Sequence, residues 1–312
     1  MTVHEPVLLA EVLRLLEVKR GGCVIDATVG GGGHTQALLE RIGPAGRLLG
    51  LDRDEEALER TRARLRSVGL RAVLAHGNFA AIAAIARQAG FDRVDAMIMD
   101  LGFSSDQLAP ERGFSFAHDG PLDGRMDRSS GPTAADLVNG LAEAELRDLF
   151  RDLGQERAAQ RIARAIVLQR DEAPIRTTGL LAAVVERAVG GRRGRLHPAT
   201  AVMRALRMRV NDELESLEQG LEGALSLLGA GGRLAVISFN SLEDTIVKRC
   251  FARHAGRWES LQAGGREWRG AAPAVRWVNR KPVTPSAAEV ARNPRARSAK
   301  LRVAERAGPP ER

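Results

Sequence analysis

Residues 23–35 read CVIDATVGGGGHT, an apolar run that breaks into four glycines and restarts as a helix. Because glycine has no Cβ, such a loop can take positive φ and bring its backbone amides close to a ligand, and the N-terminus of the following helix favours a negative group. A second apolar run, Gly46–Leu51, ends in Asp52. That acid lies about 20 residues past the loop, where dinucleotide folds place a ribose-binding acid. The two features predict a nucleotide-type cofactor site.

The glycine spacing narrows the choice of cofactor. A dinucleotide fingerprint needs glycine at its first, third and sixth positions, and counting from Gly30 the sixth position is Thr35. S-adenosylmethionine fits better, because it has no pyrophosphate and its amino-acid end presents an amine and a carboxylate, which an amide-rich turn can hold. We therefore predict S-adenosylmethionine as the cofactor. A glycine turn in an unrelated α/β protein is the structural alternative, which Asp52 disfavours, and an enzyme using NAD is the weakest reading.

Length and composition set outer bounds. A chain of 312 residues predicts about two folded units. No apolar run reaches the ~20 residues of a membrane span, and the N-terminal residues lack the basic and apolar parts of a signal peptide, so we expect no membrane association and a cytoplasmic protein. Cys23 and Cys250 fit reduced thiols, and we predict no structural metal.

Basic residues are segregated along the chain. Residues 151–210 hold 13 Lys and Arg against 5 Asp and Glu, and residues 251–312 hold 14 against 5. Residues 1–150 are net acidic, with 17 against 22. Two basic stretches beside an acidic cofactor half suggest a surface for a polyanion, most simply nucleic acid. Solvated helix faces in an arginine-rich chain are the alternative interpretation.

The spacing of the apolar runs predicts an α/β fold with a doubly wound, Rossmann-like sheet. After the run at 71–75, a fourth at 94–99 closes on Asp100, and the next convincing strand, 232–238, comes more than 130 residues later. An ordinary crossover needs only a few dozen residues. We therefore predict a methyltransferase domain formed by residues 1–107 and 212–312, and an inserted all-helical subdomain at 108–211. The expected helices are 142–153, 157–169, 178–189 and 199–228, the last leading back into the sheet.

The C-terminal part carries weaker signals. We expect a helix at 242–255, with Ser241 as its N-cap in a capping box, and a late strand at 274–278. The rest, 284–312, is rich in Pro and Arg without a clear period, and we expect it to be largely irregular.

Ligands of open α/β sheets bind beyond the carboxyl ends of the strands, which selects the candidate site residues. Asp52 suits a ribose, because a carboxylate can accept from both hydroxyls. Phe79 suits stacking on adenine, with ordinary core packing as the commoner role of a lone Phe. Asp100 suits acceptance from the cofactor amine or from a substrate N–H, and Asn240 is expected to face the site. Asp100 and Asn240 are our candidate catalytic residues.

The segment after the fourth strand separates this chain from DNA amino-methyltransferases. Those enzymes usually carry Asn, Asp or Ser followed by Pro-Pro-aromatic at this point. Here the residues are Asp100-Leu101-Gly102-Phe103. The backbone can still present carbonyl acceptors beside an aromatic ring, but the departure argues against DNA as the substrate.

Taken together, these residues resemble the bacterial ribosomal RNA small-subunit methyltransferase H family, of the MraW type. The resemblance covers nearly the whole chain, and several of its motifs are long and unusual. It rests on HEPVLL (4–9), the glycine loop through His34, LDRD (51–54), DLGFSS (100–105) with Gln107-Leu108, ERGFSF (111–116), DGPLD (119–123), HPAT (197–200) and NPRARS (293–298).

The resemblance implies methylation of the exocyclic N4 of a cytidine in the decoding region of 16S ribosomal RNA, within the small ribosomal subunit. It implies that the helical insert helps to enclose the RNA substrate. The oligomeric state stays open, and a homodimer is one of the alternatives. The chain departs from the family at Asn240, where His is usual, and at Gly124, where larger residues are common. The cofactor-binding residues that it implies are Gly32, Gly33, His34, Asp52, Phe79, Asp100 and Gln107.

The expected reaction is in-line displacement at the sulfonium methyl by the cytosine amine, which requires positioning and N–H acceptors more than a strong base. The base must be unstacked to react. Two rivals stay open, namely a methyltransferase acting on another amine and an RNA-binding ribosome assembly factor that binds the cofactor with little turnover. The arginines that we expect to hold RNA phosphates are Arg157, Arg161, Arg164, Arg192, Arg193 and Arg195.

Overall fold

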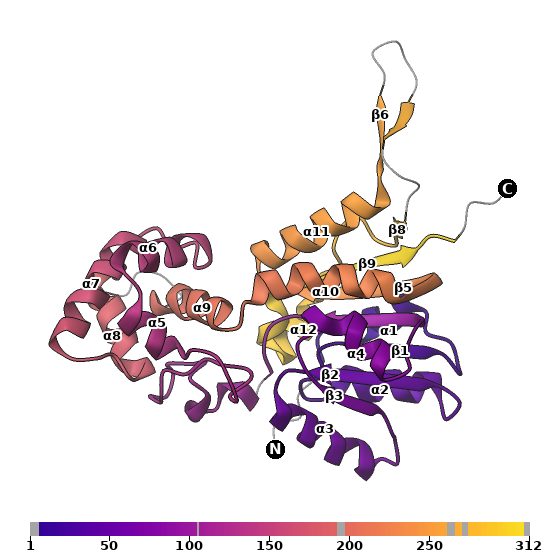
Figure 1. Ribbon diagram of the computed structural model, residues 1–312, viewed down its shortest axis with the longest axis horizontal. Coiled ribbons are helices and arrows are strands. Elements are labelled where there is room, and N and C mark those ends of the chain that lie inside the picture. The colour runs from indigo at the N-terminus through magenta and orange to yellow at the C-terminus, as the bar shows by residue number, and fades with distance from the viewer. Residues whose placement is uncertain (1–5, 105, 192–196, 261–265, 270–273, 309–312) are drawn as a thin grey trace. The chain divides into compact units, whose positions relative to one another are not determined.

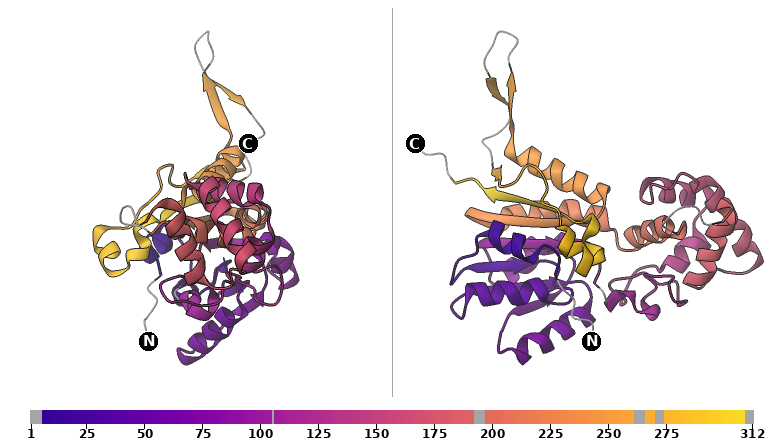
Figure 2. Two further views of the ribbon diagram at one scale, coloured as in Figure 1. Left: turned by 90° about the vertical axis from the view of Figure 1, so that its left-hand side faces the viewer. Right: turned by 180° about the vertical axis from the view of Figure 1, so that it is seen from behind.

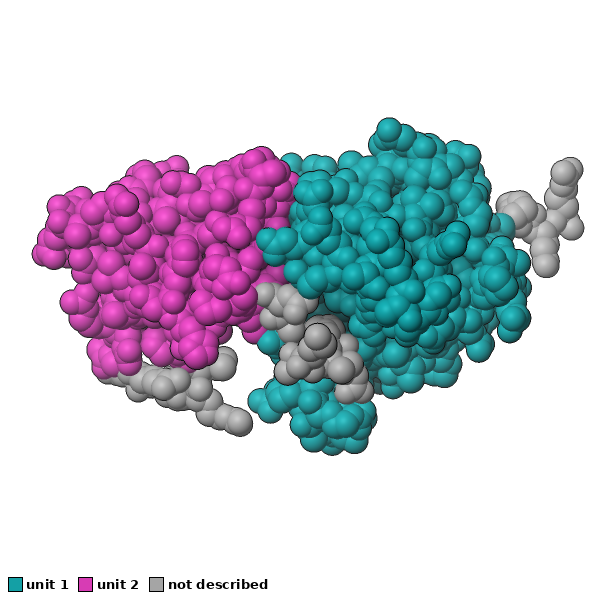
Figure 3. Space-filling model, turned by 90° about the horizontal axis from the view of Figure 1, so that it is seen from below, with its two compact units in different colours: residues 1–103, 214–312 teal, residues 104–213 magenta. Residues whose placement is uncertain are grey.

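The computed structural model describes residues 6–104, 106–191, 197–260, 266–269 and 274–308. The chain divides into two compact units, which Figure 3 colours separately. Unit 1 comprises residues 1–103 and 214–312, and unit 2 comprises residues 104–213. The insert that we predicted at 108–211 lies within unit 2.

Unit 1 is built on a seven-stranded sheet of order β3-β2-β1-β4-β5-β9-β8 (Figure 1). Strands β1 to β5 are parallel to one another, while β9 is antiparallel to β5 and to β8. The order turns between β1 and β4, so the loops after these two strands lie at the point where such folds bind ligands. The predicted doubly wound sheet is confirmed. The strands are β1 (Cys23–Asp26), β2 (Arg47–Asp52), β3 (Val73–His76), β4 (Val94–Asp100), β5 (Leu228–Ser238), β8 (Val275–Trp277) and β9 (Lys300–Arg306).

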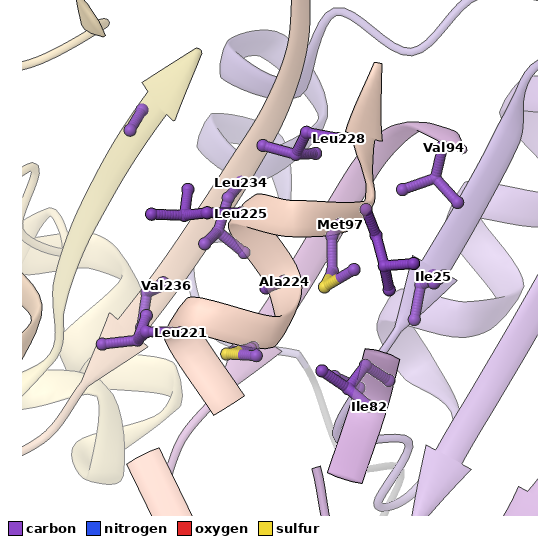
Figure 4. Packing of buried hydrophobic residues seen from close by; sticks show 14 of the residues in the cluster. Ile25, Ile82, Val94, Met97, Leu221, Ala224, Leu225, Leu228, Leu234 and Val236 are labelled. Carbon is purple, nitrogen blue, oxygen red and sulfur yellow. The ribbon is translucent and has the colours of Figure 1, made fainter. Parts of the chain in front are cut away.

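Helices cover both faces of this sheet, because alternate residues of each strand point to opposite faces. Ile25 and Met97 belong to the core under α4 (Ile82–Gln88), α10 (Glu213–Leu227) and α11 (Ser241–Ala255) (Figure 4). Their neighbours Val24 and Ile98 belong to the core on the other face. That face is covered by α1 (Leu9–Leu16), α2 (Gly33–Ile42) and α3 (Glu55–Ser67).

The prediction of a largely irregular C-terminal segment is wrong. Residues 287–292 form α12, and Lys300–Arg306 form β9, a buried strand inside the sheet. The sequence did not reveal this strand because it contains charged side chains. In the folded protein these side chains are buried in ion pairs with other elements of unit 1. Arg302 contacts Asp244 of α11 with 2.6 Å between Nε and Oδ1, and Glu305 pairs with Arg233 of β5 at 2.9 Å between Oε2 and Nε.

Unit 2 is helical and has its own apolar core. The predicted single helix at 199–228 is two helices, because Asp212 takes φ 45° and separates α9 from α10. Asn211, 1% exposed, binds the segment before α5 at this break. Its side chain donates to the carbonyl of Gly124 and accepts from the N–H of Met126, both at 2.8 Å. The helices of this unit are α5 (Ala134–Gly140), α6 (Glu143–Asp152), α7 (Ala159–Glu172), α8 (Thr178–Val189) and α9 (Ala199–Val210).

A two-stranded antiparallel ribbon, which the sequence did not predict, follows α11 (Figure 2). It pairs β6 (Arg257–Ser260) with β7 (Arg266–Arg269). Across the described part of the chain, none of the helices combines the length and the apolar character that a membrane span requires.

Candidate active site

The glycine loop between β1 and α2 is shaped by positive φ at Gly30 (49°) and Gly32 (75°). Its carbonyls are held by α3, where Thr61 Oγ1 donates to Gly30 O at 3.2 Å and the Arg64 guanidinium donates to Gly31 O at 3.0 Å. A Cβ on Gly32 would lie 2.7 Å from Thr61 Oγ1, closer than atoms pack. The loop therefore excludes larger residues at Gly32 for reasons of both backbone conformation and space.

Asp26, the last residue of β1, is fully buried and stabilises this loop through two hydrogen bonds. Its carboxylate accepts from the Thr28 N–H at 3.1 Å and from Thr35 Oγ1 at 2.6 Å. Burial raises the pKa of Asp26 to about 6, although these two hydrogen bonds oppose the shift. Both carboxylate oxygens serve the fold of the loop.

Asp52, the last residue of β2, lies beside the same loop. Its Oδ2 accepts from the Gly30 N–H at 2.7 Å, and its Oδ1 accepts from the Asp54 N–H at 2.9 Å. Burial raises its pKa, and these hydrogen bonds lower it. Each carboxylate oxygen has a second lone pair, so the geometry leaves Asp52 able to accept from two hydroxyls as well.

Asp100 ends β4, on the other side of the switch point from Asp52. Its backbone N–H donates to Thr28 Oγ1 at 2.6 Å, and its Oδ2 lies 3.6 Å from His34 Nδ1. Its Oδ1 is buried and has no hydrogen-bond partner among the described residues. The pKa of Asp100 is raised well above its usual range by burial and then by the carboxylates of Asp26 and Glu243. A group with these properties favours a cationic or N–H-bearing ligand.

The residues after β5 correct one prediction. Ser241 was expected to cap α11, but Asn240 is the cap, and its Oδ1 accepts from the N–H groups of Leu242 and Glu243, both at 3.0 Å. Glu243, only 3% exposed, returns the interaction by accepting from the N–H of Phe239 at 2.8 Å and from that of Asn240 at 3.3 Å. The oxygen of the candidate catalytic amide is thus engaged in starting the helix.

Glu243 was not predicted to have a role at the site, yet its charge raises the pKa of Asp100. It stands three residues after the cap, where glutamate completes such a box. That spacing gives no sign of the approach to β4, because β4 lies more than 140 residues earlier in the chain. Only the folded sheet brings the two carboxylates close.

The remaining predicted residues differ in how they are placed. His34 is 5% exposed, and its Nε2 lies 3.1 Å from the carbonyl of Val7. Phe79 is half-buried in a short 3-10 helix that follows β3, with a ring edge so close to α10 that a Cβ on Gly220 would lie 2.6 Å from its Cδ2. A Cβ on Gly33 would lie 2.9 Å from Pro6 Cγ, so this glycine is required for packing.

Gln107 belongs to unit 2, where it is 5% exposed and its Oε1 accepts from the Ser104 N–H at 3.0 Å.

Of the arginines expected to hold RNA, Arg157, Arg161 and Arg164 are exposed at the start and on the outer face of α7. Arg192, Arg193 and Arg195 lie outside the described residues.

The glycine loop and the acids at the ends of β1, β2 and β4 form the constellation of a nucleotide-type cofactor site. A family model described as the MraW methylase family matches residues 1–307. This chain belongs to the MraW methylase family. Membership of a methylase family, together with the glycine loop and Asp52, supports the predicted cofactor, S-adenosylmethionine. Asp100 Oδ1, which has no hydrogen-bond partner in the described part of the chain, fits its positively charged groups.

Curated MraW relatives match over almost the whole chain. The protein named "Ribosomal RNA small subunit methyltransferase H" from Geobacter sp. (strain M21) is 51% identical over 97% of this chain and 98% of its own length. A protein of the same name from Thermomicrobium roseum is 49% identical over 98% of this chain and 94% of its own. Among solved structures, a SAM-dependent O-methyltransferase from Thermotoga maritima aligns with 100% of this chain and 70% of its own, at 11% identity and TM-score 0.43. Both sequence relatives therefore carry the name of a methyltransferase of small-subunit ribosomal RNA and align with this chain over nearly its whole length.

Proposed function

We propose that this protein transfers the methyl group of S-adenosylmethionine to the exocyclic N4 of a cytidine in the decoding region of 16S ribosomal RNA. The substrate is the RNA within the small ribosomal subunit, and the place of action is the cytoplasm, where that subunit assembles. The name shared by the relatives supports the RNA, and the resemblance in the motifs supports the base and the atom.

The observation that carries this proposal is the environment of Asp100. Its Oδ1 is buried without a hydrogen-bond partner among the described residues, and the Asp26 and Glu243 carboxylates make the electrostatic potential around it negative. A buried acceptor without a donor is costly unless a ligand supplies one. Both the ammonium group of the cofactor and the amine of a cytosine carry such donors.

In this proposal the other residues at the strand ends hold the cofactor. The amides of Gly32 and Gly33, with His34, lie at the positive end of α2 and suit its carboxylate. Asp52 binds the ribose hydroxyls, and Phe79 stacks on the adenine. The resemblance to the family implies Gln107 as a further cofactor-binding residue.

S-adenosylmethionine supplies an electrophilic methyl group on a sulfonium when it is bound. The task of the protein is to hold the amine in line with that bond and to accept its N–H groups. Asp100 and the carbonyls of Leu101 to Phe103 are suitable acceptors. Gly102, with φ 111°, changes the direction of the backbone at this point. Methylation makes the nitrogen cationic and acidic, so no strong base is required. Asn240 is a candidate for orienting the base through its amide N–H groups.

Unit 2 is proposed to contact the RNA. The basic stretch 151–210 lies almost entirely within it, and Arg157, Arg161 and Arg164 are exposed where phosphates can reach them. Because the target base must leave its stack to react, a flexible loop of RNA suits the site better than a duplex.

The test is to incubate the protein with methyl-labelled S-adenosylmethionine and small ribosomal subunits from cells lacking the activity, and then to identify the labelled nucleoside. Label in N4-methylcytidine supports the proposal. Label in another nucleoside or in protein would contradict the proposed substrate and identify a different methyl acceptor. Binding of the cofactor without any label would favour the assembly-factor reading.

Asp100→Asn separates binding from chemistry in the same assay, because it keeps the shape of the side chain and removes its charge. We expect less product at saturating cofactor, with the affinity for the cofactor measured separately by calorimetry. Asp95→Asn is the matched control, since Asp95 is an exposed acid on the same strand. It should leave product formation unchanged.

A further inference from the structure

Three side chains with metal-binding atoms converge between α10 and α11, at the far end of α11 from Asn240. Glu222 comes from α10, while Cys250 and His254 lie one turn apart on α11. Their ligand atoms all lie within 4.8 Å of one another. Cys250 Sγ is 3.6 Å from Glu222 Oε1, and His254 Nε2 is 2.9 Å from Glu222 Oε2.

The two separations from Glu222, 3.6 and 2.9 Å, are close to the edges of a coordination tetrahedron. Zinc binds sulfur at about 2.3 Å and nitrogen or oxygen at about 2.0–2.2 Å, which places neighbouring ligand atoms roughly 3–4 Å apart. A thiolate and a carboxylate together balance a divalent charge, and the neutral imidazole completes three protein ligands. The fourth position would be filled by water.

Water and ions can reach the cluster. Glu222 and Cys250 line a surface pocket of about 370 Å³ between the two helices. The Cys250 residue itself is 5% exposed, the Glu222 side chain 45% and the His254 side chain 26%. The thiol therefore forms the floor of the cluster, and the other two groups form its mouth.

One neighbouring cation competes for the same carboxylate. The Arg253 guanidinium contacts Glu222 Oε1, but its side chain is 68% exposed. An exposed ion pair contributes at most about 1 kcal/mol, whereas thiolate and imidazole coordination of zinc is far stronger. Arg253 can therefore turn into water when a metal takes its place.

We propose that Glu222, Cys250 and His254 form a binding site for a borderline-soft divalent cation, of which Zn²⁺ is the fitting example. The ion joins α10 to α11, whose buried apolar residues belong to one core over one face of the sheet. The site lies about 20 Å along α11 from Asn240, so its role is to stabilise the fold of unit 1 and is separate from methyl transfer.

Metal binding at this site must displace a proton from Cys250. A coordinating cysteine binds as its thiolate, so affinity for the ion should rise with pH. A site made only of exposed carboxylates would lose this dependence above about pH 5.

The experiment uses Co²⁺ as a spectroscopic probe on the full-length, tag-free, reduced protein. We expect visible bands of four-coordinate cobalt and a near-ultraviolet thiolate-to-cobalt charge-transfer band, saturating at one ion per chain and bleached by Zn²⁺. Cys250→Ser should abolish the charge-transfer band, and Cys23→Ser, which changes the other cysteine, should leave it unchanged. The proposal is overturned by the absence of the band in wild type or by its persistence in Cys250→Ser.

A second measurement keeps the test independent of the buried cysteine. His254→Gln and Glu222→Gln change groups at the mouth of the site and should fold normally. Each should weaken cobalt binding by at least tenfold and remove the rise in melting temperature that Zn²⁺ gives the wild type. An equal rise in both variants and the wild type would assign the ion to some other place and reject this site.

Discussion

The backbone N–H of Asp100 donates to the hydroxyl of Thr28 at 2.6 Å, which joins the end of β4 to the loop after β1. The two residues are 72 positions apart, yet the bond sets where the candidate catalytic carboxylate stands relative to the glycine loop. Thr28 itself is fixed by its N–H bond to Asp26. A chain of three residues therefore couples the floor of the cofactor loop to the group that we expect to meet the substrate.

Replacing Thr28 by Val should break this coupling while keeping the side-chain shape. The Asp100 N–H would lose its acceptor, which we expect to lower the free energy of unfolding by about 1–2 kcal/mol and to reduce methyl transfer more than cofactor affinity. Urea denaturation and the labelled-nucleoside assay measure the two effects. Thr28→Ser keeps the hydroxyl and should behave like the wild type, and a Val variant equal to it would show that the bond is dispensable.

Gly32 of the glycine loop has a matched control in Gly21, which precedes β1. Gly21 and Gly32 both have φ near 75°, but a Cβ at Gly21 meets nothing within 4 Å, whereas at Gly32 it meets Thr61. We expect Gly21→Ala to cost about 1 kcal/mol from backbone strain alone. Gly32→Ala should cost clearly more and should also weaken cofactor binding, as measured by calorimetry. Equal losses in the two variants would mean that only conformation, and not space, selects glycine at Gly32.

Much of the cofactor half was accessible from the sequence, because its signals are local. Asp52 and Asp100 each follow an apolar strand directly, and parallel strands of one sheet end at the same edge. The expected strands at 94–99 and 232–238 and the helix at 178–189 correspond to β4, β5 and α8. Tertiary structure was needed to show that Asp100 Oδ1 is buried without a hydrogen-bond partner among the described residues.

The features that the sequence did not reveal depend on partners distant in the chain. Strand β9 reads as a charged tail until Asp244 and Arg233 are known to neutralise its Arg302 and Glu305. The helix at 199–228 shows no break until Asn211 is seen bonded to residues more than 80 positions earlier.

The candidate metal cluster was missed for the same reason. Cys250 and His254 have the spacing of two ligands on one helix turn, a signal that was present in the sequence. Their third partner, Glu222, comes from a different helix.

Asp26 makes stability depend on pH with an unusual sign. Because burial raises its pKa from 3.8 to about 6, the folded protein holds this proton more tightly than the unfolded chain. Stability should therefore fall as pH rises from about 4 to about 6 and then level off, and the loss attributable to Asp26 is about 3 kcal/mol. Denaturation of wild type and Asp26→Asn across this range should give curves that converge at low pH and separate at high pH. Parallel curves would contradict the shift.

Asp100 should link cofactor binding to pH in the opposite direction. Its raised pKa means that the cofactor-free protein keeps the carboxyl protonated at pH values where an exposed Asp is ionised. A cationic ligand favours the ionised form, so binding should release a proton and affinity should rise with pH, at most about tenfold per unit. Calorimetry in buffers of different ionisation enthalpy measures that proton. Asp100→Asn should bind about tenfold more weakly, without proton release, and unchanged release in this variant would assign the proton to another group.

Asn240 allows capping and chemistry to be separated by choice of substitution. Its Oδ1 starts α11, and removal of a cap typically costs about 1 kcal/mol, so Asn240→Ala should lose that much stability. Asn240→Ser retains a capping oxygen but has no amide N–H groups to offer a substrate. If the amide orients the cytidine, the Ser variant should unfold like the wild type and yet form much less N4-methylcytidine at saturating cofactor. Wild-type turnover in Asn240→Ser would show that this residue has only its structural role. In that case Asn240→His, which introduces the residue usual in the family, should change the free energy of unfolding more than the rate of methyl transfer.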